Sequence, residues 1–181
     1  MFNEAYSSTA NFAWSSFGRE VSGIHELGLH TMYGRISYKS GPWKLILDTY
    51  SRRKGHNNFD GFNDFDDVDV YTRIRAPYEN HDGFICEVYD SSFLSVIGKL
   101  FGMQDIEIGD KYFDDRFIIK ANNDTNMMLL LKQDRIRELI KLHSNMHLKV
   151  NSDQRALGSY HPDGRNEVYF ETNRIISDLD T

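Results

Sequence analysis

The chain has 181 residues, of which 40% are hydrophobic and 13% aromatic, so it can fill the core of one ordinary globular domain. With 21 Lys and Arg against 27 Asp and Glu, the formal net charge of −6 argues against binding nucleic acid through a broadly basic surface. The single cysteine, Cys86, excludes an intrachain disulfide and a cysteine zinc site. No apolar run reaches the roughly 18 to 20 residues of a membrane-spanning helix, and the start lacks a signal-peptide pattern. We expect one cytoplasmic domain over residues 1–181.

The first half of the chain predicts a helix followed by four strands. Apolar residues recur at three- and four-residue steps through the first twenty residues, which is the spacing of an amphipathic helix. The period then changes to two and predicts strands at 32–39, 43–50, 68–76 and 83–89. Because the turn between the first two strands is short and parallel neighbours need a long crossover, we expect an antiparallel meander.

Helices and strands alternate in the second half. A helix is expected from Asp90 or Ser91 to Gly102, then a strand at 117–119. Residues 126–142 predict a helix that breaks near Gln133, where one apolar block gives way to another.

The remaining segments complete the predicted sheet. Strands are expected at 146–150, 156–160 and 167–172, and residues 173–181 are expected to begin another helix that the chain does not finish. Strands in runs, with helices between the runs, indicate a single α+β domain. We expect an antiparallel meander sheet with an N-terminal helix and helices packed on one face.

Residues Gly102 to Lys120, GMQDIEIGDKYFDDRFIIK, form a distinctive pattern. A helix ends in Gly, an Asp-x-x-x-Gly turn follows, and Phe-Asp-x-x-Phe leads into a hydrophobic strand and a helix. Together with the upstream strand Tyr71-Thr72-Arg73, this pattern resembles a family of uncharacterised bacterial proteins, some of them fused to or beside membrane segments. The resemblance covers about residues 70 to 150. It implies a bacterial domain of unknown function and no activity, because such families have no established catalytic residue.

The same segment also has a structural explanation. Phe113 and Phe117 are four residues apart, as a tight turn entering a strand can require, and both are expected in the core. Asp114 and Asp115, beside Arg116, can cap backbone amides or form local ion pairs, since turns prefer Asp and Gly for backbone reasons.

The most unusual segment runs from His56 to Asp69 and is both acidic and aromatic. It contains five Asp and no Lys or Arg, which accounts for most of the net charge of −6. Long loops in compact domains are more often functional or disordered than idle. A protein partner is therefore expected to contact the phenylalanines, spaced three apart, and the carboxylates between them: Phe59, Phe62, Phe65, Asp64 and Asp66.

Two other readings of this loop stay open. Clustered oxygen ligands suit Ca²⁺ or Mg²⁺, so residues 60–69 are a candidate divalent-cation site. Asp64 and Asp66 alternate as in a calcium loop, but the glycine and the closing Glu of such a loop are not in place. The other reading is a polar connection whose phenylalanines fold back onto the sheet, with the basic residues 52–54 pairing with the acids.

Histidine and cysteine give weaker signals. His143 and His147 have the i, i+4 spacing of two metal ligands on a helix, but residues 145–150 read as a strand that would separate the rings. Cys86 lies on the apolar side of a predicted strand, where burial raises the pKa of a thiol and suppresses its reactivity. No hydrolase, nucleotide or dinucleotide motif occurs. No catalytic residue, metal ligand or cofactor is therefore predicted.

Three functions remain open. The leading hypothesis is a non-enzymatic binding or interaction module that takes a protein partner through the acidic aromatic loop. The second is a small apolar ligand carrier, or an enzyme, with a pocket between sheet and helices. Its lining would come from aromatic residues on the predicted strands: Trp43, Tyr50, Tyr71, Phe84 and Tyr89. The third is a divalent-cation-binding domain.

Overall fold

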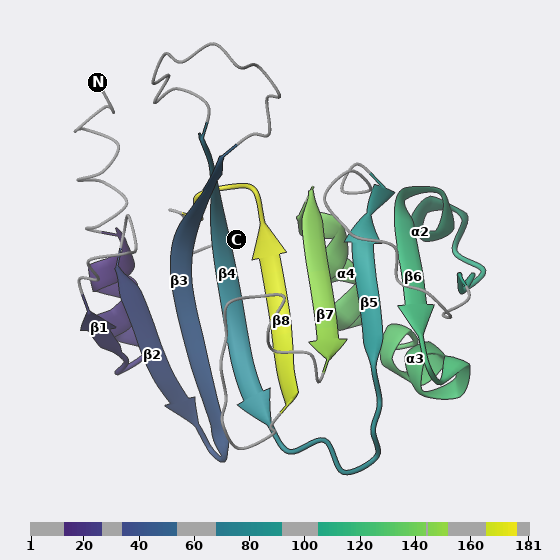
Figure 1. The fold of residues 1–181 in the computed structure, drawn as a ribbon, viewed down its shortest axis with the longest axis horizontal. Coiled ribbons are helices and arrows are strands. Elements are labelled where there is room, and N and C mark those ends of the chain that lie inside the picture. Colours follow the sequence, from purple (N-terminus) through teal and green to yellow (C-terminus); the bar gives the residue numbers. More distant parts are fainter. Residues whose placement is uncertain are drawn as a thin grey trace.

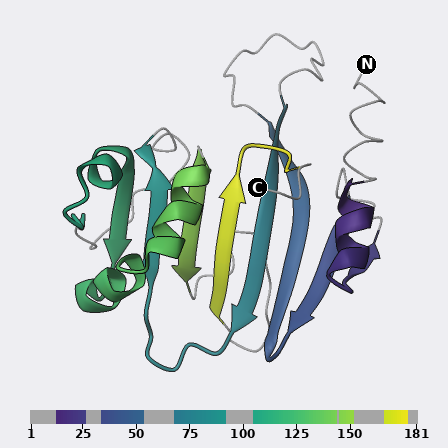
Figure 2. The same cartoon turned by 180° about the vertical axis from the view of Figure 1, so that it is seen from behind.

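The computed structural model describes residues 13–26, 34–53, 68–91, 105–143, 145–151 and 166–176. These residues form an antiparallel sheet of eight strands with helices on one face (Figures 1 and 2). The expected α+β class is therefore confirmed.

The strands lie side by side in the order β1-β2-β3-β4-β8-β7-β5-β6, and each neighbouring pair is antiparallel. Their bounds are β1 (Ile24–Glu26), β2 (Arg35–Ser40), β3 (Trp43–Arg53), β4 (Val68–Tyr78), β5 (Cys86–Asp90), β6 (Phe117–Ala121), β7 (Met146–Asn151) and β8 (Asn166–Thr172).

The first four strands form a meander, and β5 departs from it. Strand β1 was not expected, because three residues are too few to show a period. The sequence places β5 next to β4, but in the structure β5 pairs with β6 and β7, and β8 pairs with β4. The expectation of one simple meander is corrected here: β8 and β7, which come last in the chain, lie between β4 and β5.

Two helices carry the chain from β6 across β5 to β7. They are α3 (Asp124–Leu131) and α4 (Asp134–Leu142), so the expected helix does break at Gln133. The side chain of Asn123 caps α3 by accepting a hydrogen bond from the backbone N–H of Asn126 at 3.0 Å.

A short helix, α2 (Lys111–Arg116), replaces the tight turn expected before β6. Asp110 caps this helix by accepting from the N–H of Phe113 at 3.2 Å. The Asp114 carboxylate accepts from the N–H groups of Ile108 and Gly109, both at 2.9 Å. Asp114 therefore caps backbone amides and Asp115 forms a local ion pair with Lys111 at 2.9 Å, both as expected.

The strand register gives the sheet one apolar and one polar face. One row of register partners crosses seven strands on the apolar face: Ile36, Leu47, Ile74, Phe170, Leu148, Val88 and Ile119. At the β6 end, helices α2 to α4 cover this face with Phe113, Met127, Leu131 and Ile140. At the other end the helix at 13–20 covers it with Trp14, which packs on Ile36 and Leu47. The described helices all lie on one face, as expected (Figure 2).

Several expected elements cannot be compared with the structure. The helix from Asp90 or Ser91 to Gly102, beyond residue 91, and the strand at 156–160 lie outside the described residues, as does the loop at 54–67. Residues 173–176 are described and are not helical, contrary to the helix expected there. The Thr72 hydroxyl holds this segment against β4, because it donates to the Arg174 carbonyl at 2.7 Å and accepts from the Ile176 N–H at 3.1 Å.

Candidate functional site

Ionisable side chains crowd the polar face of the sheet and are buried there. This burial is unusual, because charged groups away from water are stable only when they are paired. Seven of them are at most 9% exposed: Asp48, Arg75, Glu87, His147, Lys149, Glu167 and Glu171. Five of these seven belong to two groups, one around Glu171 and one around Asp48.

The Glu171 cluster consists of Tyr50, Glu87, His147, Tyr169 and Glu171. The hydroxyl groups of Tyr50 and Tyr169 both donate to Glu171 Oε2, the latter at 2.6 Å. His147 Nδ1 lies 3.5 Å from Glu171 Oε1, and His147 Nε2 lies 2.5 Å from Glu87 Oε1. The cluster joins β3, β8, β7 and β5, so it links side chains that are far apart in the sequence.

Hydrogen bonds outweigh burial in setting the charge states of this cluster. Burial lowers the pKa of His147, but its hydrogen bonds to Glu171 and Glu87 raise the pKa by a larger amount. The net pKa therefore lies above the ordinary value. Burial raises the pKa of Glu171, but His147, Tyr169 and Tyr50 lower it to a net value below the ordinary one. Burial and the Glu171 charge both raise the pKa of the two tyrosines, which remain hydroxyl donors.

An imidazolium between two carboxylates can exchange protons or lock the strands together. The second oxygen of Glu87, Oε2, is buried and accepts no hydrogen bond within the described part of the chain. The other carboxylate oxygens of Glu87 and Glu171 contact His147 or a tyrosine of the same cluster. Internal pairing of this kind favours a structural role, because breaking one partner of a buried pair is strongly destabilising.

The Asp48 cluster consists of Asp48, Arg35, Arg73 and Arg75. Arg73 Nε donates to Asp48 Oδ1, and its Nη2 donates to Oδ2 at 3.1 Å. Arg75 Nη2 donates to the same Oδ2 at 2.8 Å, while Arg35 Nε stays 3.5 Å away. Asp48 is fully buried, so this carboxylate holds guanidinium groups from β2 and β4 against β3.

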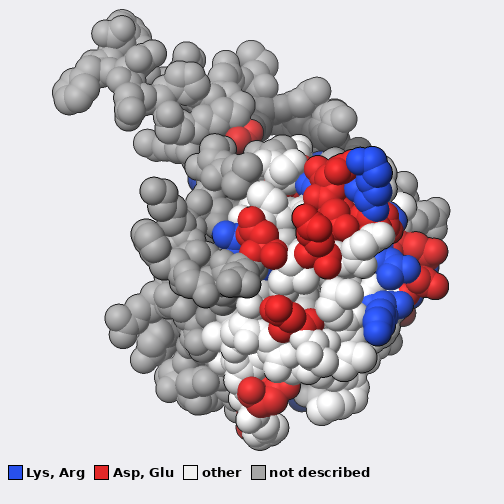
Figure 3. Space-filling model, turned by 90° about the vertical axis from the view of Figure 1, so that its right-hand side faces the viewer, with Lys and Arg blue, Asp and Glu red and all other residues white. Residues whose placement is uncertain are grey.

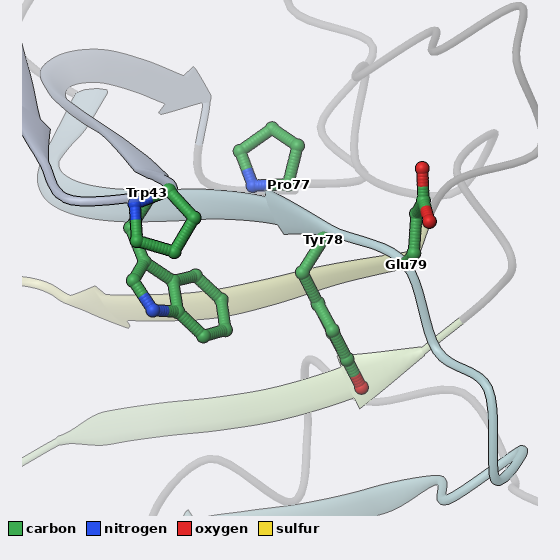
Figure 4. A pocket seen from close by; sticks show the side chains of 5 residues that line it. Trp43, Pro77, Tyr78 and Glu79 are labelled. Carbon is green, nitrogen blue, oxygen red and sulfur yellow. The ribbon is translucent and has the colours of Figure 1, made fainter.

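An aromatic pocket opens where β3 begins and β4 ends (Figure 4). We call it the Trp43 pocket: its volume is about 410 Å³, and the described residues that line it are Pro42, Trp43, Pro77, Tyr78 and Glu79. The rings of Trp43 and Tyr78 project to the same side, with their centroids 5.9 Å apart and their planes inclined at 38°. Trp43 is 42% exposed, which is high for a side chain of this size.

The structure separates the aromatic residues that the sequence grouped around one apolar cavity. Trp43 lines the pocket, whereas Tyr50, Tyr71 and Tyr89 lie on the polar face. Phe84 packs against the apolar core under α2 to α4. These five side chains therefore do not line a common cavity.

The two histidines with helical spacing are also separated. The ring of His143 lies against Phe170 on the apolar face, at 5.3 Å between centroids, and His147 lies on the polar face. Within the described ranges, no group of three or more His, Cys, Asp or Glu side chains is arranged to hold a metal ion. Cys86 is fully buried, as expected, and burial raises its pKa to about 12.

The residues of the predicted partner-binding loop cannot be placed. Phe59, Phe62, Phe65, Asp64 and Asp66 all lie outside the described residues, so the partner-binding and divalent-cation readings of this loop stay predictions.

Sequence reasoning missed the two buried clusters. The alternation in β4 places Arg73 and Arg75 on one face, and the alternation in β8 places Glu167 and Glu171 on one face. That pattern is typical of a solvated face, and it does not show that β8 lies beside β4. The one signal of these clusters in the sequence is the number of charged residues on the two strands.

Acidic side chains outnumber basic ones on the β6 side of the described structure. Seen from the β6 side, Asp and Glu side chains gather with fewer Lys and Arg among them (Figure 3). Between residues 105 and 116, beside β6, there are five acidic residues, Asp105, Glu107, Asp110, Asp114 and Asp115, and two basic ones, Lys111 and Arg116. None of the described helices combines the length and the apolar character needed to cross a membrane.

Comparison with protein-family models, curated proteins and solved structures found nothing that matches this chain.

Proposed function

We propose that the protein is a non-enzymatic binding module that holds a proline-containing segment of a partner protein in the Trp43 pocket. The exposure of Trp43 carries this proposal. An exposed tryptophan that packs against a second ring gives a rigid apolar surface, and such residues dominate the binding energy of many interfaces. The volume of about 410 Å³ is in the range of pockets that take small groups.

The chemistry of the lining favours a proline-rich segment with a basic residue. Extended proline-rich peptides bind grooves lined by aromatic side chains, because their conformation costs little entropy to fix and their carbonyls remain free to accept hydrogen bonds. The Trp43 indole N–H is a donor for such a carbonyl. Glu79, whose side chain is 69% exposed, lies at the pocket and would attract an Arg or Lys of the partner.

The buried polar face supports the role of a scaffold. Side chains of the Glu171 cluster bind one another, and Asp48 binds two arginines. The buried thiol of Cys86, with its pKa raised to about 12, is a poor nucleophile. A sheet cross-linked in this way would hold the hairpin that presents Trp43 in a fixed position.

Tryptophan fluorescence tests the proposal directly. Trp43 is 42% exposed and Trp14 only 2%, so a ligand in the pocket changes the emission of Trp43 alone. The probe is a proline-rich decapeptide with one arginine. We expect a saturable blue shift of the emission. The Trp43→Phe variant lacks this reporter, so its binding is measured by calorimetry, and we expect it to be weaker.

Two controls make the result specific. The same peptide with its prolines replaced by alanine should bind much more weakly, and the Tyr112→Ala variant should bind as well as the native protein. Tyr112 is an exposed aromatic residue on α2, at the far end of the sheet. Absence of a saturable change with the proline peptide, or equal affinity of Trp43→Phe and the native protein in calorimetry, contradicts the proposal.

The acidic aromatic loop remains a second proposed contact for the same partner. This loop joins Arg53, the last residue of β3, to Val68, its partner on β4. Arg53 is ten residues along β3 from Trp43, which is a distance of about 33 Å in an extended strand. The loop and the Trp43 pocket thus belong to opposite ends of one hairpin, so variants of each can be compared in the same fold.

A further inference from the structure

The lining of the Trp43 pocket is rich in rings and poor in hydrogen-bond donors. Pro42 and Pro77 have no backbone N–H, so neither position can donate to a ligand. Among the described side chains that line the pocket, only the Trp43 indole and the Tyr78 hydroxyl carry a donor. An anion is held by several donors at once, so this lining does not suit an anion.

Acceptors are also scarce beside the two rings. The Tyr78 hydroxyl is already hydrogen-bonded to the side chain of Asn166. The Glu79 side chain leaves β4 on the side away from the rings of Trp43 and Tyr78 (Figure 4). A guanidinium or an ordinary ammonium carries several N–H groups, and leaving them without acceptors costs free energy. The lining therefore favours a cation that has no N–H group to satisfy.

The charge around the rings is negative. Burial raises the pKa of the Tyr78 hydroxyl, and the nearby charge of Asp82 raises it further. Glu79 adds a second carboxylate at the pocket, and its ion pair with His81, at 3.6 Å, is exposed and therefore weak. The described residues that line the pocket include no Lys or Arg. A cation is therefore attracted to this end of the sheet.

The turn that carries both acids is fixed by its own hydrogen bonds. Asn80 Nδ2 donates to the carbonyl of Phe84 at 2.8 Å, and Asn80 Oδ1 accepts from the Phe84 N–H at 3.2 Å. Asp82 Oδ1 accepts from the same N–H at 3.2 Å. The backbone that carries Glu79 and Asp82 is thus in place before a ligand arrives, which lowers the entropic cost of binding.

The two rings are placed so that one cation can contact both. A cation is attracted to an aromatic face when it lies within about 6 Å of the ring centroid, and tryptophan gives the strongest attraction. The centroids of Trp43 and Tyr78 are 5.9 Å apart, so a single cation can lie within this distance of both. Trp43 is 42% exposed, which leaves part of its surface open to a ligand.

We propose that the basic residue of the partner segment is a trimethylated lysine, whose ammonium group lies on the rings of Trp43 and Tyr78 beside Asp82. This inference rests on the proposed function, because it names the residue that the partner adds to its proline. A trimethylated ammonium keeps its positive charge, has no N–H group and places its methyl groups on the rings. The pocket volume of about 410 Å³ leaves room for it next to a proline ring.

Four peptides that differ in one residue test this inference. They are the proline-rich decapeptide with trimethyllysine, lysine or arginine, and the same peptide with a neutral analogue in which carbon replaces the ammonium nitrogen. Calorimetry measures the affinity of each. We expect the trimethyllysine peptide to bind about tenfold more tightly than the neutral analogue, which has the same shape and no charge. We also expect it to bind several-fold more tightly than the lysine and arginine peptides.

A charge variant connects this preference to the pocket. Asp82→Asn keeps an oxygen that can accept from the Phe84 N–H and removes the negative charge. It should at least halve the ratio between the affinities of the trimethyllysine and neutral peptides. Glu138→Gln is the matched control, because Glu138 is exposed on α4, and it should leave this ratio unchanged.

Free choline distinguishes a partner's lysine from a small ammonium compound. Choline has the same trimethylated group without the proline-rich chain, so we expect it to bind far more weakly than the trimethyllysine peptide. Choline that binds as tightly as the peptide would overturn the assignment to a partner's lysine.

Three further results would overturn the inference. They are equal affinity for the trimethyllysine and neutral peptides, equal affinity for the trimethyllysine peptide and the lysine or arginine peptide, and an unchanged ratio in Asp82→Asn. In each case, binding of the arginine peptide that depends on its prolines leaves the proposed function in place. Failure of all four peptides to bind contradicts the proposed function and this inference together.

Discussion

His147 and Glu171 lie directly opposite each other on β7 and β8 and form a buried ion pair, with Nδ1 of the imidazole 3.5 Å from Oε1 of the carboxylate. Glu87 contacts the other side of the same imidazole from β5. One titratable ring therefore holds together three strands of the sheet.

The stability of the protein should depend on pH through this ring. The pKa of His147 is raised, so its contribution is complete below the ordinary value of 6.5 and is lost as the pH rises through the folded value. The pKa of Glu171 is lowered, so its contribution is present above the ordinary value of 4.5 and is lost as the pH falls through the folded value. We expect the free energy of unfolding in urea to decrease as the pH rises above the ordinary histidine value of 6.5.

Histidine variants separate this effect from other titrations. His147→Gln should be less stable by about 3–5 kcal/mol at about pH 6, because the two carboxylates lose their buried partner, and its stability should fall less with rising pH. His81→Gln is the matched control, since the His81 side chain is 85% exposed. Equal slopes for the native protein and His147→Gln would contradict the assignment.

Neighbouring aspartates of α2 should differ sharply in their effect on stability. Asp114→Ala removes the acceptor of two backbone N–H groups, at Ile108 and Gly109, and should cost about 1–3 kcal/mol. Asp115→Ala removes an exposed ion pair with Lys111 and should cost at most about 0.5 kcal/mol. Urea unfolding of the two variants checks this, and equal losses would refute the capping role of Asp114.

The thiol of Cys86 should be protected by the fold. It is fully buried and burial raises its pKa to about 12, so the reactive thiolate is scarce at neutral pH. We expect a thiol reagent to modify the native protein at least about a hundredfold more slowly than the protein in guanidinium chloride. Similar rates in both conditions would show that the strand β5 is open to solvent.

The phenylalanines of the acidic loop give a prediction that starts from the sequence. Replacing Phe59, Phe62 and Phe65 together by Ser should abolish binding of a partner at the loop and leave the melting temperature unchanged. Calorimetry and partner titration measure the two effects separately. A lower melting temperature would mean that these side chains belong to the core, and the loop would lose its proposed role.

The sequence predicted the local elements of the fold better than their neighbours in the sheet. Strands β3 and β4 begin at Trp43 and Val68 as expected, because alternation and the Gly41 turn are local signals. Nothing local shows that Thr72 pairs with Thr172, so β5 was expected beside β4. Pairing between distant segments depends on which strand covers the free edge, and periodicity does not contain that information.

The candidate sites were predictable only in part. Trp43 was recognised as a possible ligand contact, but Tyr78, its neighbour in the pocket, was not, because the end of β4 was placed before it. Asp48 and Glu171 were missed because a charged residue on an alternating strand ordinarily faces water. Their burial follows from the arrangement of the whole sheet.

The central place of β8 has a consequence for synthesis on the ribosome. Strands β1 to β4 form one half of the sheet, and β5 to β7 form the other, but only β8 pairs with both halves. Until residue 172 has left the ribosomal exit tunnel, the nascent chain holds two half-sheets, each with an open edge. The last described strand therefore closes the domain, and the edges of β4 and β7 are where a holding chaperone would act on the growing chain.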